Sequence, residues 1–92
     1  MTILVLQRGW VVIGEGSKES GEWRLERASV IRRWGTTAGV GQLALEGPQS
    51  ETIADPCGSV QAHELTVVLA IDVTEEAATK WRERGAPRKA RR

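Results

Sequence analysis

The chain of 92 residues has no phenylalanine, no tyrosine, one cysteine and one histidine. With Cys57 alone, no disulfide can form within the chain, and Cys57 and His63 supply too few ligands for a metal cage. No apolar run approaches the roughly 20 residues needed to span a bilayer, and the first residues show no signal-peptide pattern. We therefore expect a soluble protein of a reducing cytosol, with no cofactor, no metal and no membrane partner.

Sequence templates for catalysis are missing as well. There is no Gly-x-Ser-x-Gly, no Cys-x-x-Cys, no His-Glu-x-x-His and no phosphate-binding loop ending in Lys and Ser or Thr. A nucleophile pair of Cys57 and His63 lacks a third group to orient the base, and a single histidine on an apolar strand is more often a packed core residue. We therefore expect a binding protein rather than an enzyme.

Charge is distributed unevenly along the chain. Residues 80–92 contain seven basic residues and one acid, whereas residues 1–79 contain six bases and eleven acids, a net charge of −5. An acidic body argues against a broad nucleic-acid-binding face. Nucleic-acid contacts are expected only weakly, through the basic tail, residues 86–92; the alternative is a solvated tail that aids solubility.

Period-two apolar patterns predict a β-rich fold. A bulge is expected near Glu26–Arg27, because the apolar residues change phase there. A polar segment, Gly16–Gly21, is expected to be a hairpin loop, and Gln49–Ser59 a loop with a turn at Asp55–Gly58. The predicted strands are Thr2–Gln7, Trp10–Gly14, Glu22–Trp34 and Val60–Val73.

Two helices complete the prediction. A short one is expected within Ala38–Glu46, with Thr37 as N-cap and a stop at Gly47. The second starts after Thr74 and is ended by Gly85 and Pro87. Together the elements predict a single mainly β (α+β) domain, residues 1–85, followed by a flexible basic tail. We expect a small bent antiparallel sheet or a partly open barrel, with one short internal helix and a C-terminal helix.

A cluster of arginine, tryptophan, glycine and threonine is the best candidate binding site. Guanidinium groups suit phosphate, an indole can stack on a base, and a helix beginning after Thr37 would offer free N–H groups to an anion. The alternative places Trp34 in the core, pairs the arginines with glutamates on adjacent strands, and makes Gly35–Thr37 a turn. The candidate ligand-binding residues are Arg32, Arg33, Trp34, Gly35, Thr36, Thr37, Arg8 and Trp10.

Several blocks of the sequence, taken in order, resemble a family of small proteins of unknown function encoded by tailed bacteriophages and prophages. The resemblance spans roughly residues 4–79, and its middle block is the most specific part. The blocks are Arg8–Gly14, Leu25–Ala28, Ile31–Thr37, Gln42–Gly47, Glu64–Val68, and Ile71 with Thr74–Ala78. The resemblance implies a phage origin and action in the cytoplasm of an infected bacterium. It carries over no catalytic residues.

These observations lead to one functional hypothesis and one alternative. The hypothesis is a phage-encoded protein that sequesters a small anionic, nucleotide-type immune signal without catalysis. A chain this short cannot enclose a ligand alone, so we expect a homo-oligomer. The alternative is a protein–protein interaction module that inhibits a host protein, or a minor virion component. That module would use an exposed apolar patch or an open sheet edge instead of a basic pocket.

Overall fold

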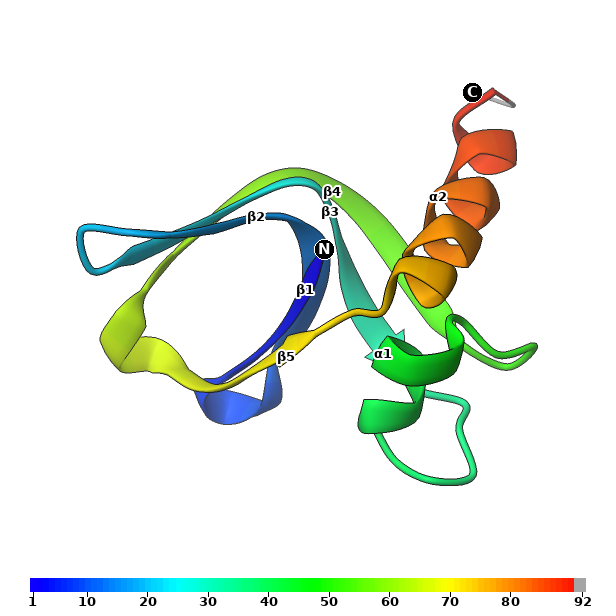
Figure 1. Ribbon diagram of the computed structural model, residues 1–92, viewed down its shortest axis with the longest axis horizontal. Coiled ribbons are helices and arrows are strands. Elements are labelled where there is room, and N and C mark those ends of the chain that lie inside the picture. The colour runs from blue at the N-terminus through cyan, green and yellow to red at the C-terminus, as the bar shows by residue number, and fades with distance from the viewer. Residues whose placement is uncertain (91–92) are drawn as a thin grey trace.

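A computed structural model describes residues 1–90 of the chain, with side chains for residues 1–84. Its core element is a five-stranded antiparallel sheet of order β4-β3-β2-β1-β5, accompanied by two α-helices (Figure 1). The elements are β1 Thr2–Leu6, η1 Gln7–Gly9, β2 Val11–Glu19, β3 Glu22–Arg33, α1 Gly41–Glu46, β4 Ile53–His63, η2 Glu64–Thr66, β5 Val67–Asp72 and α2 Glu75–Ala90.

The sheet is strongly bent but remains open, because its edge strands β4 and β5 do not pair with each other (Figure 1). This confirms the mainly β fold with one short helix and one C-terminal helix. Of the two architectures expected from the sequence, the bent open sheet is correct and the barrel is not.

The predicted bulge in β3 is present. Arg27 has a φ of 51°, and the pairing with β4 skips between Leu25 and Ala28. Because one extra residue reverses the alternation of side chains, Leu25 and Ala28 both reach the same buried cluster. Residues 26 and 27 therefore both lie on the opposite face of the sheet.

Each face of the sheet buries its own apolar cluster. The cluster on the concave face draws its residues from all five strands and none from the helices. It contains Leu4, Leu6, Val12, Trp23, Leu25, Ala28, Val30, Val60, Ala62 and Val67. The opposite face is covered by α1 and α2. Its buried residues are Ile3, Val11, Ile13, Ile31, Leu43, Ala44, Ala54, Ala77 and Trp81.

The helices begin differently from each other. In α2, the Thr74 hydroxyl accepts the Ala77 N–H at 3.1 Å, as an N-cap does. In α1, the N-cap is Val40, which makes no side-chain cap bond, so the prediction for Thr37 is wrong. Helix α1 ends at Gly47, as predicted, where φ is 92°.

The far end of α2 also differs from the prediction. Its backbone passes Gly85 and Pro87 and continues to Ala90. The predicted flexible basic tail, residues 86–92, lies outside the residues whose side chains the structure describes. Within the described residues, no helix is both long and apolar enough to cross a membrane.

Three boundaries predicted along the strands are wrong. Strand β2 continues to Glu19, so the hairpin turn is only Ser20 and Gly21. The segment predicted as a loop with a turn at residues 55–58 belongs to β4, which tolerates Pro56 because it is an edge strand. The predicted strand Val60–Val73 is split by η2, where the His63 Nδ1 accepts the Leu65 N–H at 3.1 Å.

Candidate functional site: a cleft between α2 and strands β2 and β3

Arg32 and Arg33, two of the three arginines predicted to bind a ligand, are both engaged by carboxylates near or within β4. The Arg32 Nε donates to Asp55 Oδ2 at 2.8 Å, and Arg33 lies 3.7 Å from Glu51. The hydrogen bond to Asp55 is the main reason that the pKa of Arg32 is raised. The alternative interpretation expected both arginines to pair with glutamates on adjacent strands; the partners are instead an aspartate of β4 and a glutamate that precedes β4.

The rest of the predicted segment is a turn closed by its own chain. Gly35 has a φ of 64°, and a Cβ there would lie 2.4 Å from the carbonyl carbon of Glu51. The absence of a side chain at Gly35 thus lets the backbone of Glu51 and Thr52 pass close to this turn. The Trp34 carbonyl accepts the Thr52 hydroxyl at 2.6 Å, while the Trp34 side chain is partly exposed instead of buried in the core.

The amide groups after Thr36 are also occupied. The Gln42 Oε1 accepts the N–H groups of Thr37 and Ala38 at 3.0 and 2.8 Å. Helix α1 has only six residues, too few for the anion-binding helix terminus that the sequence predicted.

Arg8 and Trp10 lie elsewhere. Strand β2 lies between β1 and β3, so Arg8, which follows β1, and Arg32 of β3 do not come from neighbouring strands. Arg8 and Trp10 instead border a hollow of about 400 Å³ beside Gln61 and His63. The predicted site residues are therefore divided between two regions of the surface.

A larger cleft lies where α2 crosses the sheet next to the β3 bulge. Its volume is about 460 Å³, within the range of small-ligand pockets. Apolar groups form much of its wall and charged groups gather at one side. The lining residues are Met1, Ile13, Gly14, Glu15, Arg27, Ala28, Ser29, Pro56, Gly58, Trp81 and Arg82.

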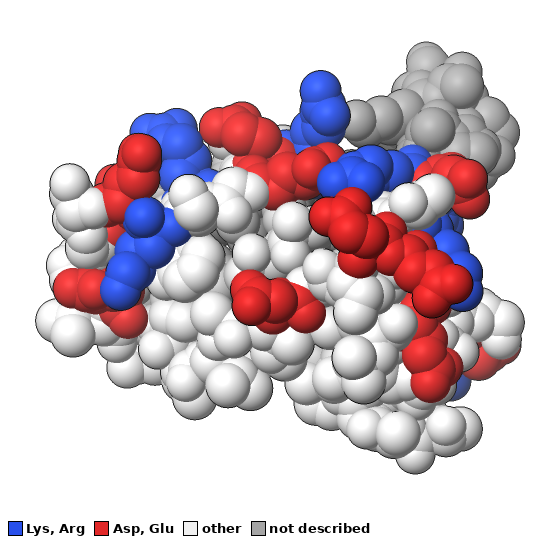
Figure 2. Space-filling model, in the orientation of Figure 1, with Lys and Arg blue, Asp and Glu red and all other residues white. Residues whose placement is uncertain are grey.

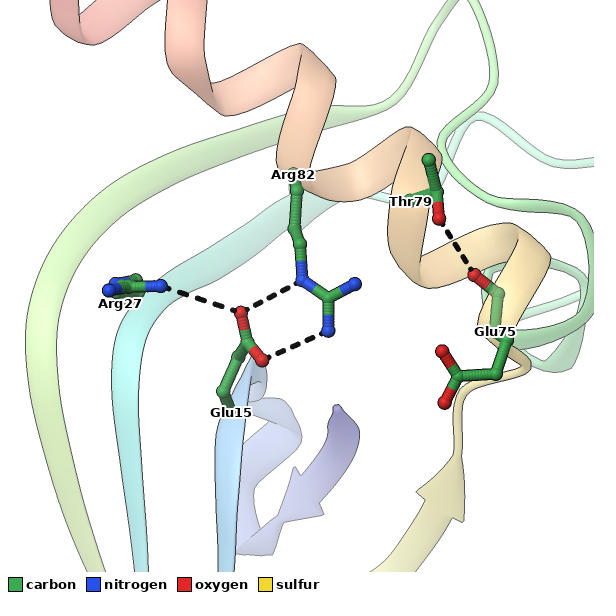
Figure 3. Close-up of polar contacts among 5 residues, drawn as sticks. All are labelled: Glu15, Arg27, Glu75, Thr79 and Arg82. Atoms are coloured by element: carbon green, nitrogen blue, oxygen red, sulfur yellow. Dashed lines mark hydrogen bonds and ion pairs between the residues drawn. The ribbon is translucent and has the colours of Figure 1, made fainter.

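Three charged side chains form a cluster in this cleft (Figure 3). The Arg82 Nε and Nη2 donate to the two carboxylate oxygens of Glu15 at 3.1 and 3.0 Å. Arg27 approaches the same carboxylate less closely, at 4.0 Å. With two guanidinium groups around one carboxylate, the cluster carries a net positive charge.

The cluster perturbs its own ionisation. The hydrogen bond from Arg82 lowers the pKa of Glu15, assisted by the charges of Arg82, the chain terminus and Arg27 and opposed by desolvation. The hydrogen bond to Glu15 raises the pKa of Arg82, and the charge of Glu75, about two turns earlier on α2, adds to this effect.

The bulge explains how Arg27 reaches the cleft. In a regular strand Arg27 would share the concave face with Leu25, because alternate residues lie on one side. The extra residue and the left-handed backbone turn Arg27 toward Glu15 on β2 instead. The phase change in the sequence thus marks this arginine. No signal in the sequence links it to Arg82, which is 67 residues from Glu15.

Gly14 forms part of the cleft floor, and no larger residue fits there. A Cβ on Gly14 would lie 2.9 Å from the Leu25 Cβ and 3.1 Å from the Ala28 Cβ. Because Leu25 and Ala28 belong to the concave-face cluster, a side chain at Gly14 would point into that cluster and not into the cleft.

The ion pairs of Glu15 lead to a prediction about acid stability. Because the folded pKa of Glu15 lies below its ordinary value of about 4.5, the unfolded chain binds more protons as the pH falls. The stabilisation is complete above that ordinary value and is lost as the pH drops through the folded pKa. We expect Glu15→Gln to lower the free energy of unfolding at neutral pH, with the difference from wild type vanishing in acid.

Urea unfolding at a series of pH values measures this difference. Glu19→Gln is the matched control, since Glu19 is an exposed carboxylate at the end of the same strand. A gap between wild type and Glu15→Gln that stays constant from neutral pH into acid would contradict the assigned direction of the pKa shift.

The described residues give little support to a Cys57–His63 nucleophile pair or to a metal site. Cys57 and His63 are separated by about 20 Å of extended strand, and partial burial raises the pKa of the thiol, which disfavours the reactive thiolate. Within the described residues, no three His, Cys, Asp or Glu side chains are grouped to hold a metal ion. Comparison with protein-family models gives no match to this chain, and comparison with curated proteins gives none either.

Proposed function

We propose that the chain is a non-catalytic binding protein that captures a small organic anion in the cleft between α2 and strands β2 and β3. One observation carries the proposal: the cleft combines about 460 Å³ of space, apolar walls and a charge cluster with more guanidinium than carboxylate groups. Pockets for small ligands have this composition, with a few polar groups set in an apolar lining.

Arg27 is the residue available to a ligand. Arg82 donates through Nε and Nη2 to both carboxylate oxygens of Glu15, whereas the Arg27 side chain is 75% exposed and meets that carboxylate only at 4.0 Å. A guanidinium has five N–H donors in a planar fork, which suits a phosphate or carboxylate. An anion beside Arg27 would also balance the excess positive charge of the cluster.

The apolar part of the cleft lining supports a ligand that has both an anionic and a flat apolar part. Ile13, Pro56 and Trp81 supply this wall. A nucleotide has both parts, with its phosphate suited to Arg27 and its base suited to the wall. Together with the sequence resemblance to phage proteins, this favours sequestration of a nucleotide-type immune signal in the cytoplasm of an infected bacterium.

Calorimetric titration with a panel of cyclic di- and trinucleotides and cyclic ADP-ribose isomers tests the proposal. We expect wild type to bind at least one member. Arg27→Gln should weaken that binding about tenfold to a hundredfold, the effect of losing one charge-assisted hydrogen bond. Because Arg27→Gln leaves the Glu15–Arg82 pair intact, we expect its stability to match that of wild type.

Arg24→Gln is the matched control for this titration. Arg24 lies on the same strand and is similarly exposed, but it pairs with Glu26 outside the cleft. The proposal is overturned if folded wild-type protein binds no member of the panel. It is also overturned if both variants weaken binding to the same extent, because the contact would then be general attraction to surface arginines.

A further inference from the structure

Strand β5 is an open edge of the sheet with an apolar surface. It pairs with β1 on one side, and among residues 1–90 no strand pairs with its other side. Val68 and Leu69 on this strand are 67% and 50% exposed, and the adjoining Leu65 of η2 is 77% exposed. We call Leu65, Val68 and Leu69 the β5 strip.

The opposite edge of the sheet differs. Strand β4 contains Pro56, the charged Asp55 paired with Arg32, and irregular pairing around Gly58. These are the features with which proteins prevent an edge strand from pairing with another chain. On β5 there is neither proline nor lysine. Its pairing with β1 also shifts register, at Val68, which has no partner on β1 and is an exposed apolar residue.

Charge around the β5 strip suits contact with an identical surface. Asp72 is the only charged residue of β5. Figure 2 shows mostly uncharged atoms over the lower part of the molecule, where β5 and α1 lie in Figure 1, and charged groups toward the top. In a symmetric contact each surface patch meets the same patch of the second copy. A patch with charges of one sign would therefore be repelled, whereas an uncharged patch would not.

We propose that the β5 strip is the interface of a homodimer, in which β5 pairs antiparallel with β5 of a second copy about a two-fold axis near Leu69. In this arrangement residues 67–71 of the two copies pair with each other, and each Asp72 lies at the start of the other copy's β5, next to η2. The two Asp72 carboxylates are then about 20 Å apart, well beyond the distance over which charges interact at physiological salt. Unpaired N–H and C=O groups of the two edges bond to each other, and the exposed leucine and valine side chains are buried.

The dimer is independent of anion binding, because the β5 strip shares no residue with the cleft. Loss of the dimer and loss of ligand binding can therefore be observed separately, in different variants of the full chain.

Sedimentation equilibrium of the full chain over a wide concentration range tests the proposal. We expect wild type to be a dimer. Leu69→Lys, which brings two ammonium groups together at the axis, should raise the dimer dissociation constant more than about a hundredfold. Val68→Lys, at a more exposed position, should weaken the dimer in the same direction. Ser17→Lys is the matched control, since it adds the same charge at an exposed position of β2.

Cysteine cross-linking locates the two-fold axis. In a Cys57→Ser background, Leu69→Cys should form a disulfide between copies on oxidation, whereas Ser17→Cys should not. Circular dichroism confirms that each variant is folded. A wild-type protein that is monomeric at every concentration overturns the proposal, and so does a dimer that both lysine variants of the strip leave unchanged.

Discussion

Replacing Trp81 with alanine is expected to remove much of the stability of this protein. Trp81 is 8% exposed and joins α2 to the apolar cluster on the helix-covered face. Its indole N–H donates to the Leu43 carbonyl at 3.0 Å, which also ties α2 to α1. Truncation of a buried tryptophan lowers the free energy of unfolding by about 3–5 kcal/mol, a large part of the roughly 5–15 kcal/mol available to a small domain.

Urea denaturation followed by circular dichroism measures this loss. Trp81→Phe separates the contributions, because it retains most of the buried ring, and the Leu43 carbonyl still accepts the N–H of Gly47 at 3.2 Å. We expect it to lower the free energy of unfolding by about 1–2 kcal/mol. Trp34→Ala, at a partly exposed position, should lower it by less than about 1 kcal/mol. Similar losses for Trp81→Ala and Trp34→Ala would contradict the role assigned to Trp81.

Gly35→Ala is the second change with a large expected effect. Gly35 has a φ of 64°, a conformation that is unfavourable for any residue with a Cβ. The added Cβ would also lie 2.4 Å from the Glu51 carbonyl carbon and 2.6 Å from the Thr52 nitrogen. Because these are backbone atoms, the segment Glu51–Thr52 just before β4 must shift to make room. We expect the free energy of unfolding to fall by about 2–4 kcal/mol.

Gly39→Ala is the control that separates conformation from crowding. Gly39 also has a positive φ, 88°, but a Cβ there would have no neighbour within 4 Å. It should lower the free energy of unfolding by only about 1–2 kcal/mol. Thermal or urea unfolding of the two variants gives the comparison. Equal losses at both positions would mean that the contact of Gly35 with the Glu51–Thr52 backbone adds nothing.

The sequence predicted local structure well at the β3 bulge and at the start of α2, but not at the start of α1, where Val40 and not Thr37 is the N-cap. The bulge at Arg27 followed from a change of apolar phase, and the start of α2 followed from Thr74. Prediction was wrong at Asp55–Gly58, which has the composition of a turn but lies in β4. An edge strand needs hydrogen bonds on only one side, and no local pattern shows whether a strand is an edge.

The candidate site could be predicted only in part, for a related reason. The sequence directed attention to Arg32, whose charge is paired with Asp55 across the β3–β4 ladder. Arg27 was located at a bulge but not assigned to a site. Its neighbours in the cluster, Glu15 and Arg82, come from β2 and α2. Because these residues are far apart in the sequence, no local pattern shows that they are close in space.

The sequence by itself determined the β-rich class, the bent third strand and the two helices, because each depends on the spacing of apolar residues and on caps within one segment. The tertiary structure alone decided the strand order, which strands are edges, and which arginine has space beside it. These depend on contacts between segments far apart in the chain, since the folding of the sheet and the docking of α2 bring Glu15, Arg27 and Arg82 together.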